Sequence, residues 1–417
     1  MREMKDSGIE WIGEIPCDWK LERSQWHLEE VNISNNPIQT NNVLSLTNKL
    51  GVVPYEEKGN QGNKSKENVY EYKLAYPNTI VANSMNILIG SVGLCDYFGC
   101  VSPVYYVFRA KKYNNIKFLN YVFQTVGFQR ELRKYANGIL EIRLRVSSSD
   151  ILKRFIPFPS EIEQQRIAEF LDRACGKIDG LKADIQAQID TLEQYKRSII
   201  TEVVTHGLNP FAPMKECSVS WARQIPQHWK VMPNKHLMTK IKNICPIYKG
   251  EDILSLTMYG VIVRDLDAGG KMPSSFDGYQ YIKKGNLLMC LFDIDVTPRC
   301  IGIIKQNGIT SPAYSQFKMK KIANARFYYY YYLMLDYTKE LLHLAKNLRH
   351  SLTEDQLGAI KQLVPPLDEQ QEIADYLDNK CAEIEQIIAD KKSQIETLDG
   401  YKKSLIYEYV TGKKEVG

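Results

Sequence analysis

The chain has 417 residues, of which 44% are hydrophobic and 25% are charged, and it carries a formal net charge of +5. These values are ordinary for folded domains, so they exclude a disordered chain and allow two or more domains. No stretch approaches the ~20 apolar residues of a membrane span, and residues 1–14 lack the apolar core of a signal peptide, so we expect a cytoplasmic protein.

The first predicted element is an extended segment at residues 8–20. Its sequence, GIEWIGEIPCDWK, returns 210 positions later at residues 218–230 as SVSWARQIPQHWK. The proline after an isoleucine favours extended backbone over helix in both copies. We expect the two tryptophans of each copy to be buried anchors rather than base-stacking groups, because aromatic rings bury large areas.

Short apolar runs with β-branched residues predict further strands in the same order in both copies. They lie at residues 43–47, 78–83 and 102–105 in the first copy, and at 253–257, 286–291 and 311–314 in the second. The last run of each copy is a Ser-Pro-x-Tyr segment. The segments at 55–66 and 259–270 share a position but not a sequence, as expected where a duplicated scaffold carries diverged reading surfaces.

Helical runs follow at residues 116–135 and 327–345. The second contains five consecutive tyrosines, which helical periodicity spreads around the axis, so some phenol groups should reach the surface or another element. Beyond these runs, Arg143 aligns with Arg349, and each arginine precedes a Ser or Thr that could cap a short helix. Arginines ahead of a helix start are good phosphate ligands, and a surface salt bridge is the alternative role.

The strongest repeat opens two long predicted helices. Residues 163–172, EQQRIAEFLD, return 206 positions later as EQQEIADYLD at 369–378, and the register continues without a gap to Val-Thr steps at 204–205 and 410–411. Insertions accumulate in loops, so an unbroken duplicated segment of this length predicts a helix. A helix over residues 163–204 would be roughly 60 Å long.

Apolar residues in both helices alternate steps of four and three, which is the heptad pattern of a coiled coil. The predicted seam of the first helix is Ile167, Leu171, Ala174, Ile178, Leu181, Ile185, Gln188, Leu192, Tyr195 and Ile199. That of the second is Ile373, Leu377, Lys380, Ile384, Ile387, Lys391, Gln394, Leu398, Tyr401 and Leu405, with two interrupting lysines. Antiparallel pairing is the simplest closure, and it would relate the two halves by a pseudo-two-fold axis.

The sequence therefore predicts an α+β protein with two tandem globular domains, residues 1–158 and 207–366, each followed by a long helix, residues 159–206 and 367–417. The globular segments carry net charges of +4 and +9, and the helices −3 and −5. Basic globular parts suit a polyanion such as DNA, and acidic helices suit a different partner.

Residues that could support catalysis are sparse. The chain lacks a glycine-rich phosphate loop, and Asn209-Pro210-Phe211 lacks the second proline of the Asn-Pro-Pro-aromatic motif of amino-methyltransferases. Glu71-Tyr72-Lys73 with an upstream glutamate is a weak nuclease pattern that the second copy does not repeat. Nine cysteines without a CxxC pair and six dispersed histidines predict buried free thiols. We expect no catalytic, cofactor or metal site on this chain.

These features resemble the DNA-specificity (S) subunit of type I restriction-modification enzymes over essentially the whole chain. The resemblance rests on WIGEIP at residues 11–16 with Trp19, on the Ser-Pro-x-Tyr segments, and above all on the Pro-x-x-x-Glu-Gln-Gln start of each long helix, followed by Leu-Asp, Tyr-Lys and Val-Thr. It implies that each globular segment is a target recognition domain, which reads one half of an asymmetric, two-part site in double-stranded DNA.

The resemblance also implies partners and cofactors. The paired helices would fix the distance between the half-sites and bind two methyltransferase (M) subunits, which methylate adenine N6 with S-adenosylmethionine. Restriction (R) subunits that use ATP and Mg would join that core. None of these activities would belong to the present chain. A self-contained restriction and methylation enzyme, and a structural coiled-coil adaptor, are the alternative interpretations.

Candidate residues follow from position and residue type. Base reading is expected from Arg, Lys, Asn and Gln in the diverged loops, and phosphate binding from arginines placed alike in both copies. The DNA-binding candidates are Lys58, Asn63, Lys64, Lys66, Arg143, Arg145, Arg264, Lys271, Arg299, Arg349 and His350. The partner-binding candidates on the helices are Glu163, Gln164, Gln165, Glu369, Gln370, Gln371, Lys380 and Lys391.

Overall fold

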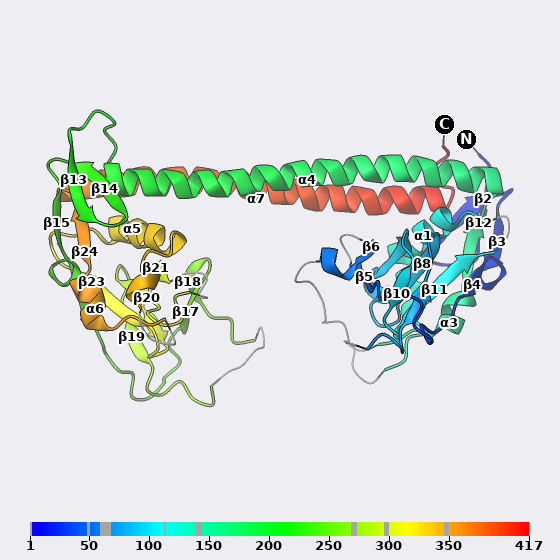
Figure 1. Ribbon diagram of the computed structural model, residues 1–417, viewed down its shortest axis with the longest axis horizontal. Coiled ribbons are helices and arrows are strands. Elements are labelled where there is room, and N and C mark those ends of the chain that lie inside the picture. The colour runs from blue at the N-terminus through cyan, green and yellow to red at the C-terminus, as the bar shows by residue number, and fades with distance from the viewer. Residues whose placement is uncertain are drawn as a thin grey trace. The chain divides into compact units, whose positions relative to one another are not determined.

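The computed structural model describes residues 2–47, 51–58, 68–111, 114–138, 144–267, 273–295, 300–345 and 350–416. The chain divides into two compact units, and each is described by itself. Unit 1 comprises Met1–Ile185 and Lys392–Gly417, and unit 2 comprises Gln186–Lys391. Each unit therefore contains one globular part, a portion of the first long helix and a portion of the second (Figure 1).

In the described part of unit 1, an antiparallel sheet has the strand order β4-β11-β8-β9, and the pairs β1-β2, β3-β12, β5-β6 and β7-β10 form two-stranded ladders. The strands are β1 (Met4–Asp6), β2 (Glu14–Pro16), β3 (Lys20–Arg23), β4 (Leu28–Glu30), β5 (Leu44–Thr47), β6 (Gly51–Pro54), β7 (Lys73–Ala75), β8 (Thr79–Asn83), β9 (Val92–Cys95), β10 (Gly99–Val101), β11 (Tyr105–Ala110) and β12 (Phe155–Phe158). The helices are α1 (Ile116–Gln124), α2 (Val126–Arg133) and α3 (Ser148–Leu152), with short 3-10 turns η1 (Ser24–Trp26), η2 (Tyr55–Lys58) and η3 (Ile87–Ile89).

Unit 2 repeats this plan, with the sheet β16-β23-β20-β21 and the ladders β13-β14, β15-β24, β17-β18 and β19-β22 among its described residues. Its strands are β13 (Met214–Val219), β14 (Ala222–Pro226), β15 (Lys230–Pro233), β16 (Met238–Ile241), β17 (Leu254–Thr257), β18 (Gly260–Val263), β19 (Gln280–Ile282), β20 (Leu287–Met289), β21 (Ile301–Ile303), β22 (Gly308–Thr310), β23 (Ser315–Met319) and β24 (Lys361–Val364). Its helices are α5 (Ala325–Tyr337) and α6 (Glu354–Ala359), with 3-10 turns η5 (Asn234–His236) and η6 (Leu342–Leu344). The repeat in the sequence is thus a repeat of the fold.

The Ser-Pro-x-Tyr segments are turns, so their prediction as strands is wrong. The Tyr105 amide donates to the carbonyl of Ser102 (2.9 Å), and the Tyr314 amide donates to that of Ser311 (3.2 Å). Strands β11 and β23 begin only at the end of these turns. The physical reason is the proline, which presets the backbone for the second position of a turn. The other predicted strands are confirmed as β5, β8, β17 and β20.

The predicted helical runs are confirmed in part, because the first is interrupted and the second is α-helical only to Tyr337, before the 3-10 turn η6. The first breaks at Thr125, whose side chain caps α2. In the second, α5 contains all five tyrosines, and four of their hydroxyls bond other elements; Tyr328, for example, donates to the carbonyl of Leu363 (3.0 Å). The predicted caps are also present, since Ser147 caps α3 and Thr353 forms a capping box with α6.

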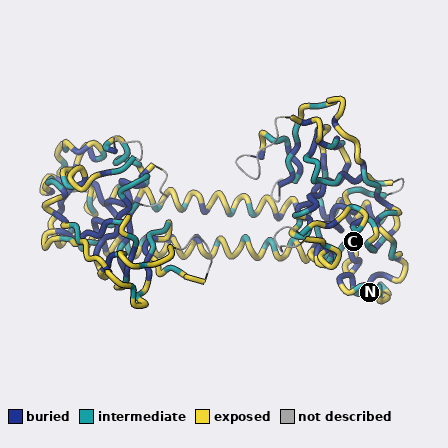
Figure 2. The backbone as a smooth tube through the Cα atoms, turned by 90° about the horizontal axis from the view of Figure 1, so that it is seen from below, coloured by how far each residue is buried: buried dark blue, intermediate teal, exposed yellow. Residues whose placement is uncertain are grey.

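The two long helices are α4 (Glu161–His206) and α7 (Leu367–Val410), and they pair antiparallel within each unit. Ion pairs between the two helices show the antiparallel direction, because residues later in α4 pair with residues earlier in α7. They are Asp179 with Lys402 and Lys182 with Asp399 in unit 1, and Lys196 with Glu385 in unit 2. Figure 2 shows that both helices are largely exposed along the part that the globular parts do not cover.

Each long helix ends on a glycine that packs against the opening segment of a globular part. Gly207 (φ +78°) lies beside Trp229, and Gly412 (φ +70°) lies beside Trp19. Left-handed backbone is the usual way to end a helix, and glycine adopts it without strain. The last turns of α7 also complete the core of unit 1, where Leu405, Ile406 and Val410 pack with Trp11 and Ile12.

None of the helices in the described residues is long and apolar enough to cross a membrane. The same residues contain no group of three or more His, Cys, Asp or Glu side chains placed to hold a metal ion.

Candidate nucleic-acid interface and helix surfaces

The Glu-Gln-Gln motif at the start of α4 binds the globular part of its own unit. Glu163 accepts a hydrogen bond from the indole N–H of Trp19 (2.9 Å). Gln164 is fully buried, and its Oε1 accepts from the backbone N–H of Asn115 (2.9 Å) while its Nε2 donates to the carbonyl of Pro159 (3.1 Å). Because Asn115 is the N-cap of α1, the motif fixes the start of that helix. We call these contacts the helix clamp.

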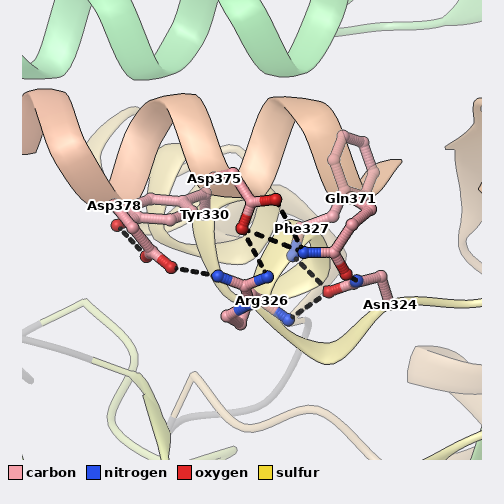
Figure 3. Close-up of polar contacts among 7 residues, drawn as sticks. All are labelled: Asn324, Arg326, Phe327, Tyr330, Gln371, Asp375 and Asp378. Carbon is pink, nitrogen blue, oxygen red and sulfur yellow. Dashed lines mark hydrogen bonds and ion pairs between the residues drawn. The ribbon is translucent and has the colours of Figure 1, made fainter. Parts of the chain in front are cut away.

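Unit 2 contains the same clamp at the start of α7. Glu369 accepts from the indole N–H of Trp229 (3.0 Å). Gln370 is fully buried; it accepts from the backbone N–H of Asn324 (2.8 Å) and donates to two backbone carbonyls (2.9 and 3.0 Å). Figure 3 shows that Gln371 extends the clamp, since it accepts from the side-chain amide of Asn324 (2.7 Å), which caps α5.

The aspartate that closes each repeated decapeptide adds a further contact to the clamp. Tyr121 donates to Asp172 (2.8 Å), and Tyr330 donates to Asp378 (2.7 Å). Burial raises the pKa of both phenols well above the usual value, and the hydrogen bond to the carboxylate raises it further, so both remain donors. In unit 2, Arg326 adds an ion pair to Asp378 (2.6 Å; Figure 3).

Six predicted partner-binding residues therefore have partners inside their own unit. They are Glu163, Gln164, Gln165, Glu369, Gln370 and Gln371. The sequence marked these positions as special because they are repeated, but repetition alone does not separate an internal contact from a docking contact. Their binding to another subunit stays a prediction.

The seam between α4 and α7 differs from the predicted one at alternate positions. In the central part of α4, Ile185 and Leu192 lie in the seam as predicted, but Lys182, Ile189 and Lys196 occupy it in place of Leu181, Gln188 and Tyr195. In α7, Ile388, Ile395 and Lys402 likewise replace Ile387, Gln394 and Tyr401. The heptad spacing fits two adjacent positions equally well, so it could not decide which of them lies in the seam. Lysine can occupy a seam position when its aliphatic stem packs there and its ammonium reaches a carboxylate.

The two lysines predicted to interrupt the second seam behave differently from each other. Lys391 is half-buried in the seam and donates to the side-chain carbonyl of Gln188 (2.5 Å). Lys380 lies beside the seam and pairs with Glu383 on its own helix (2.8 Å), so it does not interrupt the packing. Binding of a partner by either lysine stays a prediction.

The displaced seam leaves a large apolar pair exposed in each unit. Leu181 (52% exposed) and Tyr401 (55%) form the pair of unit 1, and Tyr195 (54%) and Ile387 (45%) form that of unit 2. Within each unit, both residues occupy the heptad position before a seam residue, and such positions lie on one side of an antiparallel pair. The clamp aspartates occupy the position after a seam residue, on the opposite side. We call these four residues the apolar flank.

The described DNA-binding candidates of unit 1 are Lys58 and Arg145. Lys58 is buried, and its ammonium lies 4.1 Å from the centre of the Tyr55 ring, so this structure does not present it at the surface. Arg145 is exposed, and its backbone pairs with that of Asn137 (2.8 and 2.9 Å). Asn63, Lys64, Lys66 and Arg143 lie outside the described residues.

The described candidates of unit 2, Arg264 and His350, belong to segments that meet around residues 291–295. Arg264 is half-buried near the phenol of Tyr314; burial raises the pKa of that phenol, and the arginine charge opposes the rise. Tyr314 stacks on Phe292 (6.5 Å between ring centres). His350 contacts Asp295 (2.8 Å), which is an ion pair when the imidazole is protonated. Lys271, Arg299 and Arg349 lie outside the described residues.

Sequence reasoning missed an exposed apolar tip on the β17-β18 hairpin. Met258 and Tyr259 at the turn are 58% and 78% exposed. The hairpin is held firmly, because Thr257 donates to the carbonyl of Gly260 (3.0 Å) and Val261 is buried in a core cluster. Large apolar side chains on a rigid exposed turn mark an interaction surface. The signal in the sequence was the Met-Tyr pair between two short apolar runs.

The chain is similar to known proteins both in sequence and in fold. A family model described as Type I restriction modification DNA specificity domain matches residues 27–191 and 300–397. No curated protein sequence matches the chain. A solved chain from a study of complex assembly and conformational transition of the type I R-M system has a TM-score of 0.70 and 12% identity, and the match covers 96% of the present chain and 99% of the solved one.

Two further solved structures are similar at low identity. The HsdS subunit from Thermoanaerobacter tengcongensis has a TM-score of 0.48 and 11% identity, with 96% of this chain and 98% of that chain covered. The S subunit of a type I restriction-modification system from M. genitalium has a TM-score of 0.37 and 14% identity, with coverages of 94% and 96%. The likeness to the first solved chain, with its TM-score of 0.70, shows a common fold.

Proposed function

Because the chain belongs to the family of type I restriction-modification DNA specificity domains, we propose that it reads a bipartite, asymmetric DNA site and directs adenine-N6 methyltransferase and restriction subunits to that site. The observation that carries the proposal is the duplicated fold with diverged exposed segments. Two units of one architecture, held by the same clamp, differ in sequence at equivalent positions such as residues 55–66 and 259–270, as two half-site readers would.

In unit 2, the DNA surface comprises the segments that carry Tyr259, Arg264 and His350. An exposed aromatic ring can stack on a base or wedge into a base step, and arginine reads guanine or binds phosphate. In unit 1, the exposed Arg145 forms a β-bridge with Asn137 and lies just before Ser147, the N-cap of α3. Arginines at this equivalent place in both units, Arg143 and Arg349 included, bind phosphate and so set register rather than sequence.

The apolar flank binds the methyltransferase subunits. Each unit carries one exposed pair on the side of α4 and α7 opposite the clamp, so each unit offers one docking site. This arrangement supports two methyltransferase subunits per chain. S-adenosylmethionine then belongs to those subunits, and ATP with Mg belongs to restriction subunits, while the present chain supplies recognition and assembly.

Sequencing that detects modified bases tests the proposed function. The chain is expressed with its methyltransferase partner in a host that lacks other adenine methylation. We expect N6-methyladenine in a split motif with two specified halves and an unspecified spacer, and none when the chain is omitted. A continuous motif, or methylation that does not depend on the chain, contradicts the proposal.

Copurification tests the docking surface. Leu181→Asp with Tyr401→Asp places two charges on the apolar flank of unit 1, and we expect loss of one of two methyltransferase subunits. The matched control is Ala183→Asp with Ser393→Asp, which adds the same charge at exposed positions of unit 1 outside the flank. Full retention of both subunits by the flank variant refutes this docking site.

A further inference from the structure

An ion pair at the end of α5 holds two places of the backbone in unit 2. The carboxylate of Asp336, with its side chain only 5% exposed, receives the ammonium of Lys339 on Oδ1 (2.9 Å). Its Oδ2 accepts a hydrogen bond from the backbone N–H of Cys300 (2.8 Å). The ammonium of Lys339 also donates to the carbonyl of Ile294 (3.0 Å). We call these three contacts the α5 brace.

The brace holds Ile294 and Cys300, and the residues next to them in the chain show what the brace positions. Ile294 directly precedes Asp295, the partner of His350, and Cys300 directly precedes β21, which begins at Ile301. The brace therefore fixes the chain at Ile294, after the end of β20, and at the residue from which it enters β21. Both places adjoin segments that the proposed function assigns to DNA.

Stability alone is a poor explanation for the brace. Its surroundings are apolar and include Met289, Leu335, Leu341 and Leu352. Burying the Asp336 carboxylate costs desolvation, although the Lys339 side chain is 36% exposed, and apolar residues in place of such a pair often stabilise a fold equally well or better. The charged pair instead fixes backbone positions. The carboxylate holds one backbone N–H and the lysine holds one backbone carbonyl, so the pair defines two backbone positions at once.

The brace is also absent from the repeated scaffold. Counting from the N-cap asparagines that the two units share, Asn115 and Asn324, the position of Asp336 is held by Gly127 in unit 1. An alanine-sized side chain at Gly127 would meet the Trp11 ring at 2.8 Å, so that position serves packing. Among the described residues, the brace is therefore present in unit 2 and absent from unit 1, although the two units share a fold.

We propose that Asp336 and Lys339 are positioning residues for DNA reading by unit 2, which set the geometry of the chain at Ile294 and Cys300. They touch no base themselves and act through the backbone that they hold. This inference rests on the proposed function and adds the residues on which the accuracy of one half-site depends.

Two variants test the brace in the complete assembly. Asp336→Asn keeps an acceptor for the Cys300 amide but removes the charge that attracts Lys339, and Lys339→Met removes the arm to Ile294 while keeping an apolar stem. We expect both to relax one half of the methylated motif by at least tenfold at one or more positions, with the other half unchanged. Lys339→Arg, which keeps the charge, should restore discrimination to within threefold of the unaltered chain.

The matched control is Lys134→Met, which breaks an ion pair of the same spacing at the end of α2 and should leave both halves unchanged. A uniform loss of methylation with both halves intact would show a merely structural role and overturn the proposal. If the unaltered chain yields no split motif, the proposed function is wrong; if it does and the variants keep both halves, only the positioning role is wrong.

Hydrogen exchange on the isolated chain supplies a second readout that does not need the methyltransferase. Asp336→Ala removes the acceptor of the Cys300 amide and should raise the exchange rate of that amide at least tenfold, with no change at the Asn324 amide in the clamp. Unchanged exchange at Cys300 would overturn the brace itself.

Discussion

The helix clamp makes a quantitative prediction at Gln370. Replacing Gln370 with alanine removes one acceptor from the Asn324 N–H and one donor from each of two backbone carbonyls, all at a fully buried side chain. A buried polar group left unpaired costs about 1–3 kcal/mol, whereas alanine regains only a few tenths in helix propensity. We therefore expect Gln370→Ala to lower the free energy of unfolding of unit 2 by about 3–5 kcal/mol.

The control is Gln386→Ala on the same helix, because Gln386 is exposed and bonds only Asp390 (2.9 Å). Its effect should lie within about 0.5 kcal/mol of zero. Urea denaturation followed by tryptophan fluorescence compares the two variants, and hydrogen exchange at the Asn324 amide localises the loss. If Gln370→Ala matches the control, Gln370 is not an internal clamp and the reasoning fails.

Three further predictions concern other parts of the chain. Tyr259→Ala should weaken binding of the assembled complex to its specific duplex by about 1–3 kcal/mol in a titration at fixed salt, while Tyr259→Phe keeps the affinity, because stacking needs the ring and not the hydroxyl; equal loss in both variants would count against stacking. A double-mutant cycle on Lys196 and Glu385 should give a coupling below about 1 kcal/mol, since Glu385 is 64% exposed and solvent screens the pair; a larger coupling would show that this seam pair is effectively dry. Burial raises the pKa of the Cys95 and Cys100 thiols to about 11. At pH 8 iodoacetamide should therefore alkylate the exposed Cys17 first and these two thiols only after unfolding, which mass spectrometry of the labelled peptides measures. Early labelling of Cys95 would contradict its burial.

The sequence predicted the architecture well because the chain contains it twice. The repeat starting at Glu163 and Glu369 located both long helices, and Ser147 and Thr353 were correctly placed as helix caps. These are local signals, in which a short stretch of sequence determines its own backbone. The Ser-Pro-x-Tyr turns failed for a local reason too, because the apolar residues around the proline imitated a strand.

Long-range contacts could not be read in the same way. Heptad spacing left two adjacent positions open along each helix, and only the packed structure shows that Ile189 lies in the seam while Tyr195 is exposed. The Asp336 carboxylate meets the Cys300 amide across 36 positions of chain, and no spacing rule connects them. Lys58 met the criteria for a DNA ligand but is buried against Tyr55, because a lysine stem packs readily on an aromatic ring.

The central claim is that each unit reads its own half of a split DNA site. Its most direct test replaces residues 207–366 with the corresponding segment of another member of the family and sequences modified bases in a host that expresses the methyltransferase partner. The account predicts that one half of the methylated motif changes and the other half stays as it was. Change in both halves, or in neither, would contradict it.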